Sequence, residues 1–115
     1  MAERIPPPVL GVGEVDAALA HLPGWRRSGG RIVGTYRCAG FAGAIELVVA
    51  VAALAEAADH HPDIDVRWDT VTLALATHES GGITSRDLDL AAAIDRLEVG
   101  GAAATGGAGG SGSVS

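Results

Sequence analysis

A long apolar stretch that ends in two histidines and a proline constrains this chain more than any other feature. Residues 41–55 are almost uninterruptedly apolar, and Glu46 is the one charged residue among them. Ala, Leu and Glu, which favour helices, dominate residues 41–60, so we expect one long helix there. Proline disfavours helical geometry in the residue before it, and Pro62 should therefore release His61 from that helix.

Two adjacent imidazoles, His60 and His61, are thus expected at a helix C-terminus. The negative end of the helix dipole favours the imidazolium form, and histidine titrates near neutral pH. These side chains are therefore well suited to proton transfer. Two solvated histidines in a polar helix end, with no chemical role, explain this stretch alone equally well.

The apolar run is compatible in composition with a membrane span or with a buried helix. It covers about 15 residues, fewer than the roughly 20 that a bilayer requires, and Glu46 interrupts it. We therefore expect a buried helix and no membrane partner. Its apolar surface extends most of the way round, which predicts cover by a sheet and by either a second helix or another subunit.

Length and composition limit the remaining possibilities. A chain of 115 residues predicts a single domain, here residues 1–99, and the Gly/Ala/Ser-rich sequence of residues 100–115 predicts a disordered tail. A net charge of -6 and 3% aromatic residues argue against nucleic-acid binding. The single cysteine, Cys38, cannot form an internal disulfide, and residues 1–8 lack the apolar core of a signal peptide. A cytoplasmic location is the resulting expectation.

The periodicity of the sequence predicts an α+β fold. Strand patterns come in two adjacent pairs, and each pair lies between helical patterns. This order indicates a four-stranded antiparallel sheet with helices packed on one face. The expected helices are 14–22, 41–60 and a last one opened by residues 84–87, and the expected strands are 25–27, 31–38, 66–68 and 71–78.

The second strand pair is expected to bring a third histidine toward the first two. If residues 69–70 form a two-residue turn, Trp68 pairs with Val71. In that register His61 lies opposite His78. Asp-Thr is not a preferred turn pair, but an error of one residue would still leave the imidazoles at the same end of the sheet.

Several polar side chains should gather at that end. Thr84 and Asp87 match a helix capping box, so Asp87 already has a structural role and any chemical role would be additional. Three histidines could hold zinc, but neighbouring residues on a chain point in divergent directions, which favours proton transfer and an elimination of water. The expected set is Glu56, Asp59, His60, His61, Thr77, His78, Glu79, Arg86 and Asp87.

Motifs spread over residues 22–97 form a specific combination. They are Glu56-x3-His60-His61-Pro62, then Trp68, Thr77-His78-Glu79 with Gly81-Gly82, and Thr84-x2-Asp87-x2-Leu90-Ala91-x2-Ile94. This combination resembles the pterin-4a-carbinolamine dehydratase family. The resemblance implies a homodimer or homotetramer that binds a small pterin substrate and needs no metal or other cofactor.

The resemblance also implies an activity and a set of residues for it. The activity is that of a hydro-lyase, 4a-hydroxytetrahydrobiopterin dehydratase, which gives quinonoid dihydropterin during recycling of the pterin cofactor. His60 and His78 would be the acid/base imidazoles, with His61 beside them, and the sequence leaves open which is the acid. Substrate contacts are expected from Pro62, Thr77, Glu79 and Ser80, and support from Glu56, Asp59, Arg86 and Asp87.

A non-catalytic protein of the same fold is the alternative. Some relatives in this family are thought to act as dimerisation cofactors for transcription factors or as assembly chaperones, through a helix or sheet surface. Such proteins can dispense with the histidines. This chain has all three, which favours the enzyme.

Overall fold

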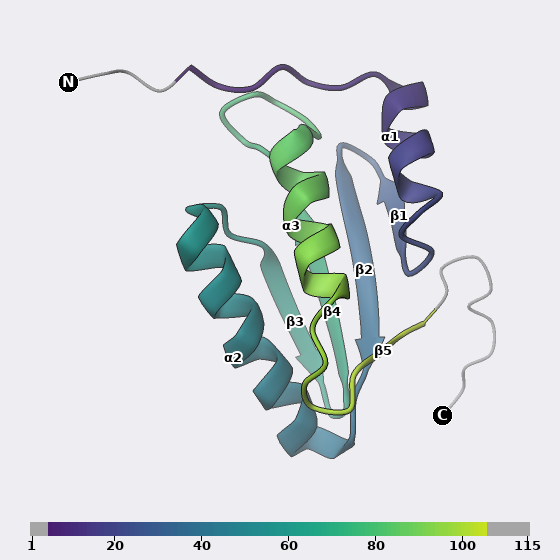
Figure 1. Cartoon of the computed structure of the whole chain (residues 1–115), viewed down its shortest axis with the longest axis vertical. Helices are drawn as coiled ribbons and strands as arrows, with labels where there is room; N and C mark the ends of the chain where they lie inside the picture. The colour runs from purple at the N-terminus through teal and green to yellow at the C-terminus, as the bar shows by residue number, and fades with distance from the viewer. Residues whose placement is uncertain (1–4, 106–115) are drawn as a thin grey trace.

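Three helices and one antiparallel sheet form the computed structural model, which describes residues 5–105 (Figure 1). The elements are α1 (Val12–Leu19), β1 (Trp25–Ser28), β2 (Arg31–Arg37), α2 (Gly40–Ala58), β3 (Asp63–Arg67), β4 (Thr70–Leu75), α3 (Ser85–Asp95) and β5 (Ala103–Ala104). The sheet order is β1-β2-β4-β3, and β5 also pairs with β2. The predicted α+β order is confirmed, and β5 is an addition to it.

All three helices cover the same face of the sheet, as the sequence predicts (Figure 1). On β4, the side chains of Val71, Leu73 and Leu75 are buried beneath the helices. The alternating residues Thr72 and Ala74 are half-buried on the opposite face. This alternation follows from the two-residue period of a strand, and it places the core between the sheet and the helices.

The end of α2 corrects the predicted helix of residues 41–60. The helix ends at Ala58, and Asp59 adopts a left-handed conformation with φ of 51°. The N–H of His60 then donates to the carbonyl of Ala55 at 3.1 Å, which is the Schellman form of helix end. His60 and His61 therefore lie beyond the helix, which ends before Pro62 can act on it.

α2 is also the one helix of the described chain that is long and apolar enough to cross a membrane by length and composition. In this fold its inner face packs into the core through Ala44, Leu47 and Val51. The helix contacts β4, β3 and α3, so the predicted cover by a sheet and a second helix is present.

The hairpin between β3 and β4 corrects the predicted register. Arg67 pairs with Thr70, so the turn residues are Trp68 and Asp69. Val71 consequently pairs with Val66, whereas the predicted partner of Val71 was Trp68. The shift is two residues, and because side chains alternate with a period of two, every side chain keeps its predicted face.

Hydrogen bonds hold this turn although Trp68 has a left-handed φ of 55°. Arg37 Nε donates to Asp69 Oδ2 at 3.2 Å, and Thr70 Oγ1 donates to Asp69 Oδ1 at 2.9 Å. Burial acts to raise the pKa of Asp69, but these two donors outweigh it and hold the pKa below its ordinary value.

The boundary between domain and tail also differs from the prediction. Residues 100–105, assigned to the tail, continue along the domain: β5 pairs with β2, and the N–H of Ala39 donates to the carbonyl of Gly100 at 2.9 Å. Residues 106–115 lie outside the described residues.

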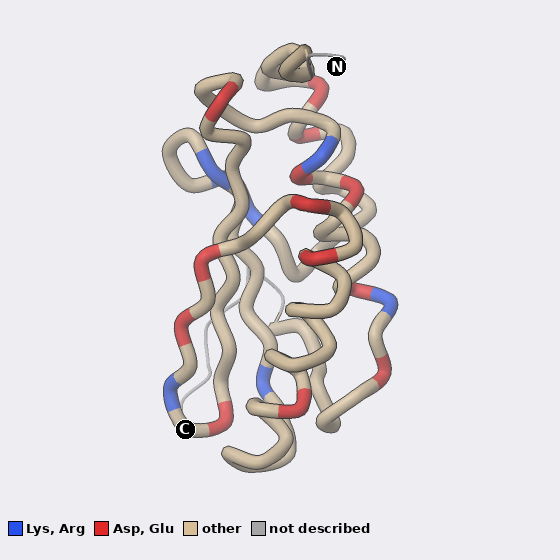
Figure 2. Tube along the Cα trace, turned by 90° about the vertical axis from the view of Figure 1, so that its left-hand side faces the viewer, with Lys and Arg blue, Asp and Glu red and all other residues tan. Residues whose placement is uncertain are grey.

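Exposed charged residues follow the edge strand β3, and α2 carries three exposed large apolar side chains. The edge strand β3 carries Asp63, Asp65 and Arg67. Figure 2 shows charged positions of both signs along one border of the molecule. Phe41, Ile45 and Val49 are 56%, 40% and 65% exposed, and their spacing of four residues aligns them on the outer face of α2. We call these three residues the α2 outer face.

Trp25 is a buried residue of the core, and its ring packs closely against Gly34 of the neighbouring strand. Its indole N–H donates to the hydroxyl oxygen of Tyr36 at 2.8 Å, and Tyr36 donates to Asp95 Oδ1 at 2.9 Å. Burial, with a smaller contribution from Asp95, raises the pKa of Tyr36. Gly34 pairs with Trp25 across β1 and β2, and a Cβ atom at Gly34 would overlap the indole ring.

We therefore expect Gly34→Ala to lower the free energy of unfolding by about 1–3 kcal/mol, because an extra methyl group overpacks a filled core. Gly30→Ala is the matched control, since open space surrounds Gly30 in the β1–β2 turn. Urea unfolding followed by tryptophan fluorescence measures both. Equal stability of the two variants would contradict this account of the sheet.

Candidate active site

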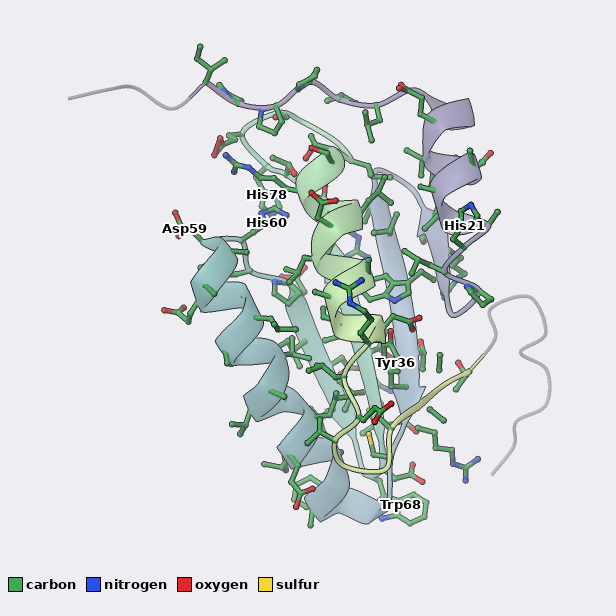
Figure 3. All side chains as sticks on the ribbon, in the orientation of Figure 1. His21, Tyr36, Asp59, His60, Trp68 and His78 are labelled. Atoms are coloured by element: carbon green, nitrogen blue, oxygen red, sulfur yellow. The ribbon has the colours of Figure 1, made fainter. Side chains whose placement is uncertain are left out.

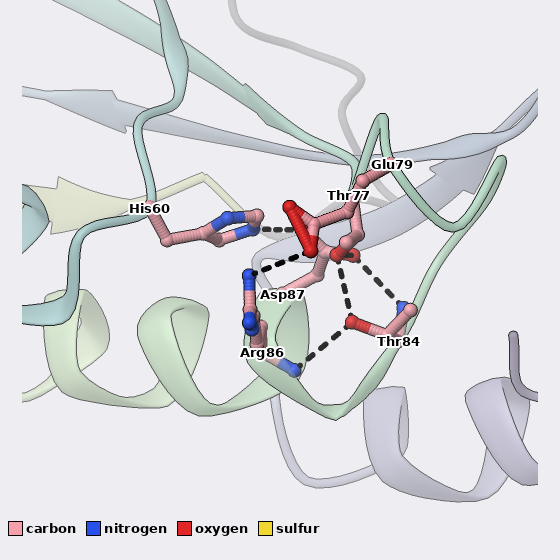
Figure 4. Close-up of polar contacts among 6 residues, drawn as sticks. All are labelled: His60, Thr77, Glu79, Thr84, Arg86 and Asp87. Atoms are coloured by element: carbon pink, nitrogen blue, oxygen red, sulfur yellow. Dashed lines mark hydrogen bonds and ion pairs between the residues drawn. The ribbon is translucent and has the colours of Figure 1, made fainter. Parts of the chain in front are cut away.

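His60 is the buried histidine of the predicted set. It follows the end of α2, and only 8% of its surface is exposed. Its Nε2 lies 2.5 Å from Asp87 Oδ1, near the start of α3 (Figure 4). Because an ionised carboxylate can only accept, Nε2 carries the proton of this pair. Nδ1 is then the ring nitrogen of His60 that this contact leaves available to other partners.

Asp87 joins three segments of the chain through its carboxylate. Its Oδ2 accepts the N–H of Thr84 at 2.9 Å and the hydroxyl of Thr77 at 2.8 Å, while Oδ1 faces His60. The Thr84 hydroxyl accepts the N–H of Arg86 at 3.2 Å, so the predicted capping box at the start of α3 is present. Asp87 is completely buried, and these donors compensate for its lost hydration.

The other two histidines are exposed, and they lie at the same end of the molecule. His61 Nε2 lies 2.8 Å from Glu56 Oε2, which restrains its ring against the last turn of α2. His78 follows β4 in the loop that the Thr77–Gly82 bridge closes. Figure 3 places His78 next to His60, with His21 on the far side of the fold and Trp68 at the opposite end.

A cavity of about 330 Å³ brings the three histidines together. We call it the histidine cavity. The sequence predicts the three imidazoles at one end of the sheet, and the cavity lies at that end. Its walls come from the end of α2, the end of β4, the following loop and α3: Asp59, His60, His61, Ala76, Thr77, His78, Glu79 and Arg86.

Four residues of the predicted set do not line this cavity. Pro62 and Ser80, expected at the substrate, are absent from its walls. Glu56 and Asp87 are also absent, and they contact His61 and His60 from outside the cavity. The Ser80 hydroxyl donates instead to the carbonyl of Pro7 at 2.5 Å, which ties the His78 loop to the N-terminal segment.

Ala76 lines the cavity although sequence reasoning missed it. An alanine beyond a strand carries no chemical signal, and only its alternation with the buried Leu75 could have indicated its direction. Arg86, expected as support, also lines the cavity directly, and its Nη1 lies 3.7 Å from Glu79 Oε2. This contact closes one side of the cavity with a pair of opposite charges.

The arrangement places one buried and two exposed imidazoles around a common space, and carboxylates contact the rings of His60 and His61. The carboxylate of Asp87 fixes the tautomer and orientation of His60, as a general acid or base requires. Within residues 5–105, no group of three or more His, Cys, Asp and Glu side chains is placed to hold a metal ion. The histidine cavity therefore offers three imidazoles and the charged side chains of Glu79 and Arg86 to a molecule that enters it.

Comparison with known families gives a consistent result. The family model described as pterin 4 alpha carbinolamine dehydratase matches residues 8–97. That range includes every residue of the histidine cavity.

Two similar proteins cover most of the chain. One, from Roseiflexus castenholzii, is 52% identical over 89 residues, which are 77% of this chain and 96% of the relative. Another, from Mycolicibacterium smegmatis, is 49% identical over 89 residues, or 77% and 95% of the two chains. Both are provisionally named pterin-4-alpha-carbinolamine dehydratase.

A solved structure shares the fold. The crystal structure of a protein from Brucella melitensis, described as "transcriptional coactivator/pterin dehydratase", matches with a TM-score of 0.72 and 29% identity. The match covers 76% of this chain and 95% of the Brucella chain.

Replacing Asp87 with Asn should destabilise the protein by about 1–3 kcal/mol, because the amide keeps one acceptor oxygen where the carboxylate offers two to Thr84, Thr77 and His60. Asp89→Asn is the matched control, since Asp89 is an exposed residue of the same helix. Urea unfolding measures the difference in the free energy of unfolding. If Asp87→Asn is as stable as Asp89→Asn, the buried carboxylate does not hold these segments together.

Proposed function

Because the chain belongs to the pterin-4a-carbinolamine dehydratase family, which are hydro-lyases, we propose that it removes water from a 4a-hydroxytetrahydropterin by histidine acid/base catalysis. The observation that carries the proposal is the shared cavity of His60, His61 and His78. No metal or other cofactor is part of the proposed mechanism.

The reaction needs one proton donor and one proton acceptor. As the bond between C4a and the hydroxyl oxygen breaks, an acid gives that oxygen a proton and water leaves. A base removes the proton from N5, and the electron pair of the N5–H bond forms the double bond between C4a and N5. The products are water and the quinonoid dihydropterin.

His60 and His78 are the two imidazoles that we assign to these steps. Asp87 holds His60 in one orientation, so its Nδ1 is pre-organised for the substrate. His78 supplies the second group from the loop after β4. The proposal assigns the two roles to the pair and not to one residue each, because a dehydration needs one protonated and one neutral imidazole.

The remaining residues bind and position. His61, Thr77, Glu79, Arg86 and Asp59 complete the walls around the pterin, and Glu56 restrains His61. We assign Ser80 an indirect role, since its bond to the Pro7 carbonyl anchors the loop that carries His78. Pro62 directs the chain from His61 into β3.

The proposed biological role is recycling of a tetrahydropterin cofactor. Aromatic hydroxylation that uses a tetrahydropterin produces the 4a-carbinolamine, and dehydration returns it to a form that a reductase can reduce. The pterin substrate is the only small-molecule partner that this role requires. The proposed place of action is the cytoplasm.

We also propose that the protein assembles as a homodimer or homotetramer through the α2 outer face. Phe41, Ile45 and Val49 expose a stripe of large apolar side chains that water solvates poorly. A symmetric pairing of two such helices would bury the stripe of each chain against the other.

A second candidate function is the binding of a regulatory protein through the same surface. The Brucella protein is described as a transcriptional coactivator as well as a pterin dehydratase. The α2 outer face could bind a helix of a regulatory protein in the same way as it binds a second copy. Lack of any activity of the parent protein toward the carbinolamine would favour this function over catalysis.

His60→Ala and His78→Ala should each slow dehydration of the enzymatically generated carbinolamine by about 10²-fold or more, the usual contribution of a general acid or base. His21→Ala is the control, because His21 is an exposed histidine remote from the cavity. The rate is followed by ultraviolet absorbance after a hydroxylase has produced the substrate. Parent-like rates in both cavity variants would refute the mechanism.

Val49→Arg should reduce the molar mass of the assembly in solution, because the substitution places a charge in the proposed apolar interface. Val12→Arg is the matched control, since Val12 of α1 is 60% exposed and Val49 is 65% exposed. Light scattering on a sizing column measures the mass. A monomeric parent protein, or an unchanged mass for Val49→Arg, would contradict assembly through α2.

A further inference from the structure

A second cavity adjoins the histidine cavity and shares two of its walls. It has a volume of about 370 Å³ and lies between α2 and α3. His60 and Arg86 line both cavities, so the second begins where the first ends. We call it the α2–α3 groove. Its aliphatic walls are Leu54, Ala57, Ala58, Leu90 and Ala93.

The chemistry of the proposed substrate places a substituent near these shared walls. In a tetrahydropterin, the hydroxyl leaves from C4a and the proton leaves from N5. The ring carbon C6, which carries the variable side chain, is bonded directly to N5. An imidazole that acts at C4a or N5 therefore lies close to the first atoms of that side chain, and His60 is the acid/base residue that borders both cavities.

We propose that the α2–α3 groove binds the C6 side chain of the pterin and so determines which pterins the protein accepts. The inference rests on the proposed function. The bicyclic ring occupies the histidine cavity, and the side chain passes His60 and Arg86 into the groove. The preferred side chain is a short, uncharged hydroxyalkyl group.

The residues that line the groove are the reason for expecting this side chain. Leu54, Leu90 and Ala93 present methyl and methylene groups that suit an aliphatic chain. Arg86 and Asp89 add a donor and an acceptor of opposite charge. A hydroxyl group can bond to both, because it donates to a carboxylate and accepts from a guanidinium. An anionic side chain would face the carboxylate of Asp89.

The small size of Ala57 and Ala93 keeps the groove open from its two sides. Ala57 is an exposed residue of α2, and Ala93 is a half-buried residue of α3. A leucine at either position would fill space that the side chain needs without replacing a residue of the histidine cavity. Ala17 of α1 is exposed and borders neither cavity, so Ala17→Leu controls for adding a leucine to a helix surface.

The experiment compares two carbinolamines, one with a dihydroxypropyl group at C6 and one with a methyl group. For each protein the quantity measured is the ratio of kcat/KM for the dihydroxypropyl substrate to that for the methyl substrate. We expect Ala57→Leu and Ala93→Leu each to lower this ratio at least about tenfold, mainly through KM. Ala17→Leu should keep the parent ratio, and circular dichroism verifies that all three variants fold.

Each failure has its own signature. If the parent dehydrates both substrates and neither groove variant changes the ratio, the inference is wrong and the proposed function stands. If a groove variant changes only the molar mass of the assembly, the groove belongs to a subunit contact and the inference is again wrong. If the parent accelerates neither reaction, the proposed function and the inference fail together.

Discussion

The carboxylate of Asp87 is the constraint on which the rest of the site depends. A buried charge is costly unless donors surround it, and here three donors from three segments meet one side chain: the N–H of Thr84, the hydroxyl of Thr77 and the ring of His60. The same contacts cap α3, attach the end of β4 to it and fix the chain beyond α2. The bonds that hold these segments together are therefore also the bonds that orient the ring of His60.

The position of the cavity follows from the direction of the chain after α2 and after β4. α2 ends in a left-handed residue, Asp59, which turns the chain back toward the sheet and points His60 at α3. β4 ends at Leu75, and the loop after it returns through the Thr77–Gly82 bridge. Both exits lie at the same end of the sheet because β3 and β4 are antiparallel neighbours. Side chains from segments far apart in sequence therefore surround one space.

Local sequence patterns predicted most of the fold. The errors lie in segments whose structure depends on contacts with residues distant in sequence. The capping box of Thr84 and Asp87 was predictable because its partners are three residues apart. The hairpin turn was misplaced because Trp68 is a poor candidate for a left-handed φ, and it is Asp69, bonded to Arg37 across the sheet, that makes this turn possible. Residues 100–105 were misassigned for the same reason, since their composition gives no sign of pairing with β2.

The prediction of the site has the same limit. The residue types and the antiparallel pairing were enough to expect three imidazoles at one end of the sheet. They could not indicate that His60 is buried against Asp87 while His61 and His78 are exposed, because that difference depends on α3, which is distant in sequence.

This difference bears on how a proton-transfer site can bind its substrate. The orientation of His60 exists before any ligand arrives, so its ordering costs nothing at the moment of binding. Within residues 5–105, no comparable hydrogen bond fixes the side chain of His78. A flat heterocycle that entered the cavity would exclude water from His78 and restrict its ring. Under the proposed mechanism, His60 would set the position of the ring, and His78 would adjust to the group that gains or loses the second proton.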